Sequence, residues 1–266
     1  MHPDKNTPIA PELMLDIDRV LRGQLGHILN ARRVLQDTLP DALDPRERKK
    51  CEKELAALNQ SSMRLLRMSN NLRDMARFLR GEEVVEPRTI DFAELCSAAC
   101  AKADAAAGGG RVAYDGPESG LVLNGDGDML ERVIYNLLVN ALRREEGTVR
   151  CVLRRAESEA RLHIYGGELE DTESAPETGL ELGLGLCALI VGGHNGKILP
   201  SSGIGGVGVA VSLPLAMPDE KMPLAQPRGN YTGDYPIWLV ELSDLPLGCG
   251  LYGTAAQKSA ASPQVI

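Results

Sequence analysis

Two long stretches near the start of the chain carry apolar residues at helical spacing. Within residues 11–39, apolar side chains recur at steps of three and four positions, as they do along one face of an amphipathic helix. Residues 39–43 interrupt this pattern. A second helix is predicted to start directly afterwards, because Asp44 can cap it, Pro45 suits its first turn and Glu47 can reach back to the cap.

The second predicted helix runs to about Gly81 and carries a heptad pattern. The positions that form this stripe are Leu55, Leu58, Ser62, Leu65, Ser69, Leu72, Ala76 and Leu79. A heptad stripe favours a helical partner, and two long helices joined by a short loop form an antiparallel hairpin. Because one hairpin buries little surface, we expect two copies to pair as a four-helix bundle in a homodimer. The alternative is a hairpin that packs on the rest of its own chain.

A charged segment with a proline, residues 82–89, predicts a linker to a second unit of mixed structure. Helices are expected at 92–107, 126–144 and 183–193, and strands at 111–114, 121–123, 147–154, 159–165, 197–200 and 207–213. Asp91 is the expected cap of the first of these helices, the glycines at 108–110 its end, and 157–159 a hairpin turn. This order predicts helices on one face of a mixed sheet.

The fold class is therefore α+β, a long antiparallel helical hairpin followed by an α/β sandwich. The predicted units are a hairpin dimerisation domain at 11–82, a sandwich domain at 88–215 and a partly irregular C-terminal extension at 216–266. Within that extension, the apolar run 237–242 predicts one more strand, and the end from Gln257 is expected to be disordered.

Composition narrows the classes of protein that fit. Of 266 residues, 43% are hydrophobic but only 3% are aromatic, which predicts a real core built from aliphatic side chains. The net charge of −8 argues against nucleic acid as the main partner. No run of about 18 apolar residues predicts a membrane helix, and the first residues lack the apolar region of a secretion signal. A cytoplasmic location is expected.

The cysteines show no spacing typical of a metal site. They are Cys51, Cys96, Cys100, Cys151, Cys187 and Cys249. Cys96 and Cys100 share a helix face, but further ligands for a metal are not evident from the sequence. We interpret the cysteines as buried free thiols in a reducing compartment.

Two amides and an arginine share one face of the helix predicted at 126–144. Asn136 and Asn140 are four residues apart, and Arg143 follows three residues later. Amide oxygens can ligate Mg²⁺, and an arginine beside them can meet a phosphate. The trio predicts a site for a magnesium nucleotide. The alternative is an asparagine pair that is satisfied by local hydrogen bonds.

Glycines precede and open the helix predicted at 183–193. Gly179, Gly183 and Gly185 lie in the run TGLELGLGL, where backbone N–H groups could approach a phosphate at a helix N-terminus. Close packing of the helix against a neighbour explains alternating glycine and leucine equally well.

In this order the motifs resemble the transmitter core of sensor histidine kinases, members of the wider gyrase, Hsp90 and MutL ATPase superfamily. The resemblance spans about 11–215 and rests on GDGDMLERVIYNLLVNALR, which is similar to the asparagine box, and on GLELGLGLCALIVGGHNGKI, which is similar to a glycine box and its helix. It implies the ATPase-type sandwich, with ATP and Mg²⁺ as cofactors. Asn140 and Asn136 would then ligate Mg²⁺, Arg143 would contact phosphate, and Gly183 and Gly185 would line the phosphates.

The glycine box aligns in two ways. Alignment on His194 places Glu181 where a glycine is normal, and alignment on the Gly-Leu repeat shortens the following helix by two residues.

The chain departs from this family at three places. The aspartate that binds the adenine amino group would fall near Gly166, and loss of such a charge-assisted hydrogen bond weakens binding roughly ten- to a hundred-fold. The lid segment, residues 168–177, is acidic and offers no lysine or arginine. The place of the phosphoacceptor histidine falls near Arg19, and the histidine on this helix is His27, two turns later. His163 and His194 are interpreted as structural.

Three functions remain open. The resemblance implies an ATP-dependent kinase that phosphorylates a histidine and passes the phosphoryl group to an aspartate of a response regulator. The departures favour an impaired or inactive form. One alternative is a pseudokinase scaffold that binds a response regulator or a partner kinase. Another is a histidine phosphotransferase that uses His27.

Overall fold

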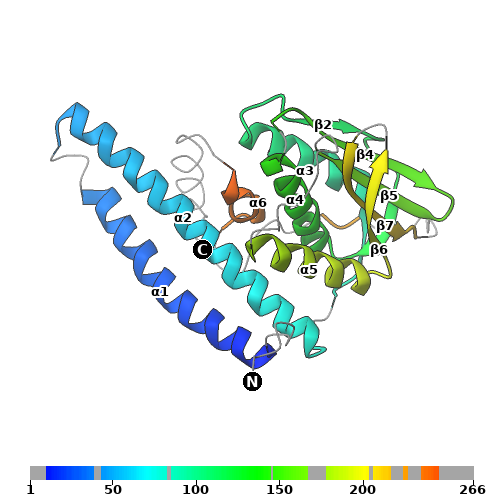
Figure 1. Ribbon diagram of the computed structural model, residues 1–266, viewed down its shortest axis with the longest axis horizontal. Helices are drawn as coiled ribbons and strands as arrows, with labels where there is room; N and C mark the ends of the chain where they lie inside the picture. Colours follow the sequence, from blue (N-terminus) through cyan, green and yellow to red (C-terminus); the bar gives the residue numbers. More distant parts are fainter. Residues whose placement is uncertain are drawn as a thin grey trace, which may run out of the picture.

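The structure is a computed structural model, and it describes residues 10–38, 43–82, 85–144, 146–166, 178–203, 206–216, 224–226 and 235–245. A long helical hairpin lies against a sandwich of three helices and a sheet (Figure 1). Among the described residues, no helix combines the length and the hydropathy that a membrane crossing requires.

The hairpin consists of α1, Pro11–Thr38, and α2, Pro45–Leu79. The start of α2 is the predicted capping box: the Asp44 carboxylate accepts from the backbone N–H of Arg46 at 2.8 Å and of Glu47 at 2.9 Å, and the Glu47 carboxylate accepts from the Asp44 N–H at 3.4 Å. Three orphan N–H groups are thereby satisfied.

The interface between α1 and α2 is partly polar, which explains the serines in the heptad stripe. Asp18 is buried there, and its carboxylate accepts from Arg22 Nε at 2.9 Å and from the Ser69 hydroxyl. A buried carboxylate requires such partners. Other stripe positions stay exposed, among them Leu58 and Leu65.

The second unit contains the following elements. They are β1 Arg88–Asp91, α3 Phe92–Ala106, β2 Val112–Asp115, β3 Val122–Gly125, α4 Gly127–Arg144, β4 Val149–Ala156, β5 Glu159–Tyr165, α5 Thr178–Gly193, β6 Lys197–Gly203 and β7 Gly206–Pro214. Five strands form a mixed sheet in the order β2-β4-β5-β7-β6, in which β2 and β4 are parallel and the other pairs antiparallel. The predicted α+β class is confirmed.

The predicted element ends follow from local chemistry. Asp91 caps α3 by accepting from the N–H groups of Ala93 and Glu94. Gly108, Gly109 and Gly110 have φ between +74° and +96°, which side chains rarely adopt, and they end α3 as expected. A two-residue turn joins β4 to β5, where Ala156 pairs with Glu159.

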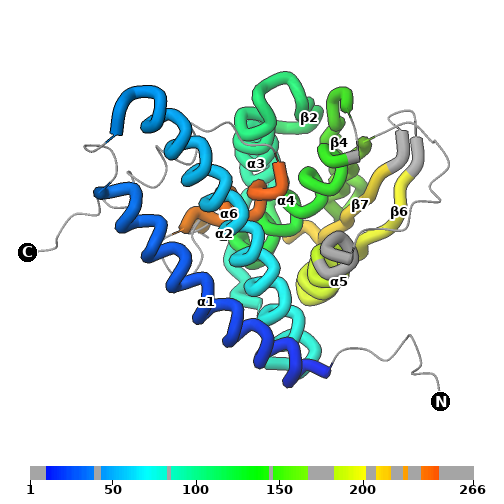
Figure 2. Tube along the Cα trace, turned by 60° about the vertical axis from the view of Figure 1, so that its left-hand side comes forward, coloured from blue at the N-terminus to red at the C-terminus, as the bar shows by residue number. Residues whose placement is uncertain are grey.

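The helices α3, α4 and α5 lie between the sheet and the hairpin (Figures 1 and 2). Their buried sides and the inner face of the sheet form an aliphatic core, to which Phe92 and Tyr135 add the largest rings. Four described cysteines, Cys96, Cys100, Cys151 and Cys187, are buried thiols as predicted, whereas Cys51 is only half-buried. Burial raises the pKa of Cys96, and a hydrogen bond with Cys100 together with burial raises the pKa of Cys151, so both thiols stay protonated.

The hairpin packs on the rest of its own chain, which was the alternative to a bundle of two copies. The side of α2 that faces away from α1 contacts α5 and the C-terminal elements, and Met63 on that side is fully buried in the main core. One side of α2 therefore belongs to the sandwich, while the exposed leucines remain on the surface.

Two predictions about the elements differ from the structure. The segment 82–89 was expected to be a linker throughout, but β1 begins at Arg88 and pairs antiparallel with β3. The run 237–242 is not a strand: it forms the helix α6, Ile237–Glu241, followed by a 3-10 turn η1, Leu242–Asp244. A short apolar run has no alternation that separates strand from helix, and the residues here are buried on several sides at once. The predicted disorder from Gln257 lies outside the described residues.

Candidate functional site

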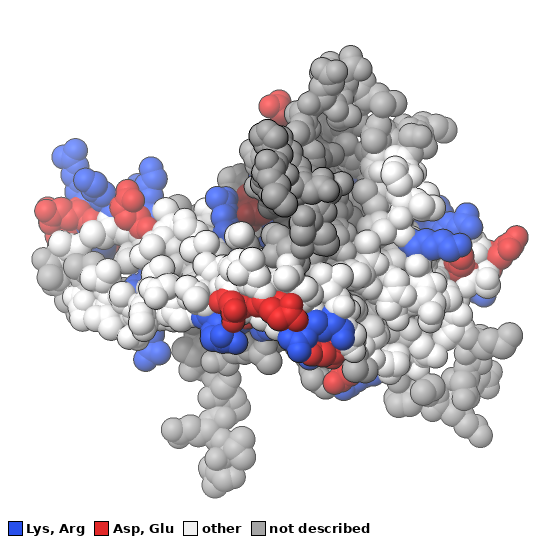
Figure 3. All heavy atoms as spheres, turned by 60° about the horizontal axis from the view of Figure 1, so that its bottom comes forward, with Lys and Arg blue, Asp and Glu red and all other residues white. Residues whose placement is uncertain are grey.

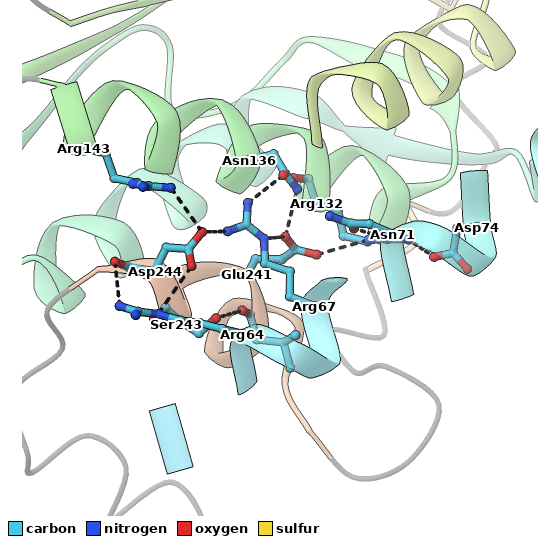
Figure 4. A network of polar contacts seen from close by, with 11 residues as sticks. Arg64, Arg67, Asn71, Asp74, Arg132, Asn136, Arg143, Glu241, Ser243 and Asp244 are labelled. Atoms are coloured by element: carbon cyan, nitrogen blue, oxygen red, sulfur yellow. Dashed lines mark hydrogen bonds and ion pairs between the residues drawn. The ribbon is translucent and has the colours of Figure 1, made fainter. Parts of the chain in front are cut away.

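The asparagine face of α4 points toward the hairpin, not toward open solvent. Asn136 lies on the side of α4 that meets α2 and α6, and only 2% of it is exposed (Figure 4). Its amide nitrogen donates to the Arg132 carbonyl at 3.0 Å and to the Glu241 carboxylate at 2.8 Å, and its amide oxygen accepts from Arg67 Nη2 at 2.7 Å. Both amide atoms are therefore engaged within the protein.

Glu241 reaches this site from α6, about a hundred residues further along the chain. Its side chain is fully buried. The carboxylate accepts from Arg67 Nε at 2.9 Å and from Arg132 Nε at 3.4 Å, in addition to Asn136. Because a buried carboxylate without cationic partners would be strongly disfavoured, these contacts determine where α6 lies.

The same arginines tie α2 to α4. Arg132 Nη1 donates to Asp74 at 2.7 Å, and Arg132 Nη2 donates to Asn71 at 3.3 Å. Arg67, Asn71 and Asp74 are spaced four and three residues apart, so they share one face of α2. Together with Arg132, Asn136 and Glu241 they form what we name the arginine–carboxylate network, which links three helices.

Asp244 of η1 forms the rim of this network. It accepts from Arg67 Nη1, and its other contacts are with Arg64 Nε at 3.5 Å and Arg143 Nη1 at 3.9 Å. Arg143, predicted to meet a phosphate, is thus directed toward a carboxylate of its own chain (Figure 4).

The network extends to α5 through close packing. A β-carbon placed on Gly183 would lie 2.8 Å from Asn136 Oδ1, and one on Gly185 would lie 3.0 Å from Met75 Cε. Burial, with Glu241 nearby, raises the pKa of Cys187 on the same helix to about 12. Because Gly183 and Gly185 have no side chains, α5 can approach α4 and α2 closely. The surroundings of Gly179, at the start of α5, lie outside the described residues.

Asn136 is not available to a magnesium nucleotide in this arrangement. Mg²⁺ binds oxygen ligands, but the amide oxygen of Asn136 already accepts a hydrogen bond from the guanidinium of Arg67. Asn140 lies one turn further along α4, and its amide nitrogen is buried without a hydrogen-bond partner among the described residues. Its role as a metal ligand stays a prediction.

The expected position of the adenine-binding aspartate is tightly packed. A β-carbon on Gly166 would lie 3.0 Å from the Ala141 β-carbon and 3.2 Å from its backbone. An aspartate there would require α4 and the end of β5 to separate by a few tenths of an ångström. The acidic lid, residues 168–177, lies outside the described residues.

The candidate phosphoacceptor positions lie on α1, across α2 from the sandwich (Figures 1 and 2). Arg19 is exposed and forms an ion pair with Asp16 at 2.9 Å. His27 is exposed two turns later, and no side chain of the described residues forms a hydrogen bond with it. The structure therefore does not bring His27 together with the asparagine face.

His163 and His194, which the sequence led us to interpret as structural, both form hydrogen bonds. His194 joins the end of α5 to the start of α4: Nδ1 donates to the Ile190 carbonyl at 2.7 Å, and Nε2 accepts from the Asp126 N–H at 2.8 Å. His163 on β5 contacts the hydroxyls of Ser201 and Tyr165.

Sequence reasoning missed Arg67, Arg132 and Glu241. Glu241 had a readable signal, because a single carboxylate inside the apolar run IWLVEL has to be buried with a partner. Nothing in the sequence indicated that its partners would lie on α2 and α4.

No family model matches the chain. Histidine kinases nevertheless resemble it in sequence and in fold. The signal transduction histidine-protein kinase BaeS of Escherichia coli (strain K12) is 24% identical over 234 residues, which is 80% of this chain and 48% of that protein. The structure of full-length ShkA in complex with AMPPNP has a TM-score of 0.62 at 19% identity and covers 83% of this chain and 48% of that one. The histidine kinase AdeS of Acinetobacter baumannii has a TM-score of 0.48 at 20% identity, over 78% of this chain and 99% of that one.

The chain thus has the hairpin and sandwich architecture of a histidine kinase core, and it spans about half the length of the curated relative that it matches.

Proposed function

We propose that the chain is a histidine-kinase-like protein of cytoplasmic two-component signalling that acts as a binding module and does not phosphorylate itself. The observation that carries the proposal is the engagement of Asn136. The amide that would serve a magnesium nucleotide is bonded to Arg67 and Glu241 of the same chain.

Two further observations support the absence of kinase chemistry. Gly166, near the expected place of the adenine-binding aspartate, has no side chain and packs closely against Ala141. Arg19 occupies the expected place of the phosphoacceptor, where the family has the imidazole of a histidine. These two positions thus differ from those that the expected phosphoryl transfer would use, although the fold is retained.

The hairpin is the surface that we expect to meet partners. Such a module would form a homodimer and dock a response regulator or a partner kinase. Exposed apolar side chains on both helices support a contact surface here, including Leu13, Val20, Val34, Leu65, Met68 and Leu79. Figure 3 shows uncharged surface over the hairpin, with charged side chains gathered in separate groups.

Nucleotide binding tests the proposal directly. We expect no thermal stabilisation of the full chain by millimolar Mg-ATP or Mg-AMPPNP, and no saturable heat in calorimetry. A ligand at a hundred times its Kd would stabilise the protein by about 2.7 kcal/mol, a shift that is easily measured. A saturable shift that Asn140→Ala abolishes and Asn124→Ala, on β3, preserves would refute the proposal.

The second candidate function is a histidine phosphotransferase, which the exposure of His27 favours. Incubation of the chain with a phosphorylated response regulator and a labelled phosphoryl group tests it. Labelling that His27→Gln removes and His163→Gln retains would establish the relay. Equal labelling of both variants, or none, would eliminate it.

A further inference from the structure

The segment 235–245, which we name the C-terminal clamp, fills a surface formed by α2 and α4. Five of its apolar side chains are at most 3% exposed and belong to the main core: Ile237, Leu239, Val240, Leu242 and Leu245. In Figures 1 and 2 the clamp lies between the hairpin and the sandwich, beside α2 and α4. It therefore joins two units that meet elsewhere mainly through α2 and α5.

Side-chain donors on α2 form hydrogen bonds with backbone carbonyls at the end of the clamp. Gln60 Nε2 donates to the carbonyls of Ser243 at 3.1 Å and Leu245 at 2.5 Å, and Arg64 Nε donates to the Ser243 carbonyl at 2.9 Å. Cations and donors at the C-terminal end of a helix satisfy its orphan carbonyls and its negative dipole. With Arg67, these residues form a stripe at i, i+4 and i+7 on α2.

The carboxylates of the clamp meet the cations of the same surface. Glu241 sits between Arg67 and Arg132, and Asp244 lies against Arg67 with Arg64 and Arg143 around it. Two of these arginines, Arg67 and Arg132, are at least nine-tenths buried. The surface thus recognises an acidic helix through its carboxylates, its last carbonyls and its apolar side.

We propose that this face of α2 and α4 is a binding site for an acidic amphipathic helix, and that the C-terminal clamp is its exchangeable ligand within the chain. Three guanidinium nitrogens, Nε and Nη1 of Arg67 and Nε of Arg132, would lose their carboxylate partners when the clamp leaves, so the empty face would favour another acidic ligand. The inference goes beyond the proposed function, because it holds whether or not the protein transmits a phosphoryl signal.

The short length of the C-terminal clamp supports its role as an exchangeable ligand rather than as a permanent part of the core. Its helix has five residues and a three-residue 3-10 turn, far below the length at which a helix is stable alone. It is ordered by the surface that it covers, as a segment that folds on binding is. Another acidic amphipathic helix can therefore replace a segment of this kind.

A cleavable form of the full chain tests the proposal. A specific protease site is inserted between residues 227 and 234, and the cut protein is followed by size-exclusion chromatography and by emission of Trp238, the single tryptophan. We expect the C-terminal fragment to stay bound after cleavage at low salt. A fragment that separates at micromolar concentration would overturn the proposal.

Exchange is then measured with synthetic peptides of residues 235–247. We expect excess wild-type peptide to release the fragment, and a peptide with Glu241→Gln to compete at least about tenfold more weakly, because it lacks the charge between the two arginines. The protein itself stays wild type, so misfolding of a variant cannot produce the result. Equal competition by both peptides, or no exchange at a hundredfold excess over a day, would overturn the proposal. Nucleotide is absent throughout, so the outcome is separate from the kinase question.

Discussion

At the scale of single residues, Arg132 joins two buried carboxylates that lie on different helices. All three guanidinium nitrogens have partners, on Asp74, Asn71 and Glu241. We expect Arg132→Ala to lower the free energy of unfolding by about 3 kcal/mol, since it leaves carboxylates buried with fewer cationic partners. Urea unfolding followed by circular dichroism measures the change.

Arg154 provides the matched control for that loss. Its ion pair with Asp115 is more than half exposed on both sides. Arg154→Ala should therefore change the free energy of unfolding by less than about 0.5–1 kcal/mol. Similar losses for the two variants would show that the network contributes no more than a surface pair.

His194 makes stability depend on pH. Burial lowers its pKa below the ordinary value of 6.5, although its contacts with Ile190 and Asp126 partly oppose this effect. The folded state keeps the ring neutral while the unfolded chain takes up a proton, so the stabilisation is complete above pH 6.5 and is lost as the pH falls below it.

We expect His194→Gln, whose amide oxygen can still accept from Asp126, to flatten the fall in unfolding free energy between pH 7 and 5. His163, whose pKa burial also lowers, is present in both proteins, so its contribution cancels in the comparison. Parallel pH curves for the wild type and the variant would contradict this account.

At the scale of elements, the capping box of α2 shows how far local chemistry extends. Asp44→Ala removes the acceptor of two backbone N–H groups and should lower the free energy of unfolding by about 1 kcal/mol, whereas Asp44→Ser, another good cap, should lose much less. Thermal unfolding of the two variants in parallel measures the difference. Equal losses would mean that α2 does not depend on its cap.

The elements that the sequence predicted are those with local signals. Helix spacing, caps and glycine ends located α1 to α4 within a few residues, whereas α5 begins at Thr178, five residues before its predicted start. Strand alternation located the five-stranded sheet. The strand β1 was missed because four residues against β3 carry almost no pattern of their own. The clamp helix was mistaken for a strand because its short apolar run is buried on several sides and so shows no helical periodicity.

The candidate site was predictable only in part. The spacing of Asn136 and Asn140 placed two amides on one face of α4, but it could not show what covers that face. Arg67 and Glu241 are about 70 and 105 residues from Asn136 along the chain, and such contacts are set by packing of whole units. A family motif can therefore survive while its partners change.

At the scale of the molecule, α2 serves two surfaces at once. Its inner side enters the core of the sandwich through Met63 and the arginine–carboxylate network. Its outer side, with α1, leaves apolar side chains in solvent. A monomer would expose all of these, which is the physical reason to expect a second copy against the hairpin.

Association of the full chain is therefore the property most sensitive to this surface. Val20 on α1 is 65% exposed, and Leu199 on β6 is 59% exposed at a distance from the hairpin. If the hairpin forms a two-fold bundle, Val20→Glu introduces a buried charge twice, and we expect the dimer dissociation constant to rise at least about a hundredfold. Leu199→Glu should leave it unchanged. Sedimentation equilibrium from nanomolar to micromolar concentration measures the wild type and both variants. A dimer through the hairpin would be excluded if the wild type remained monomeric throughout, or if the two variants associated equally.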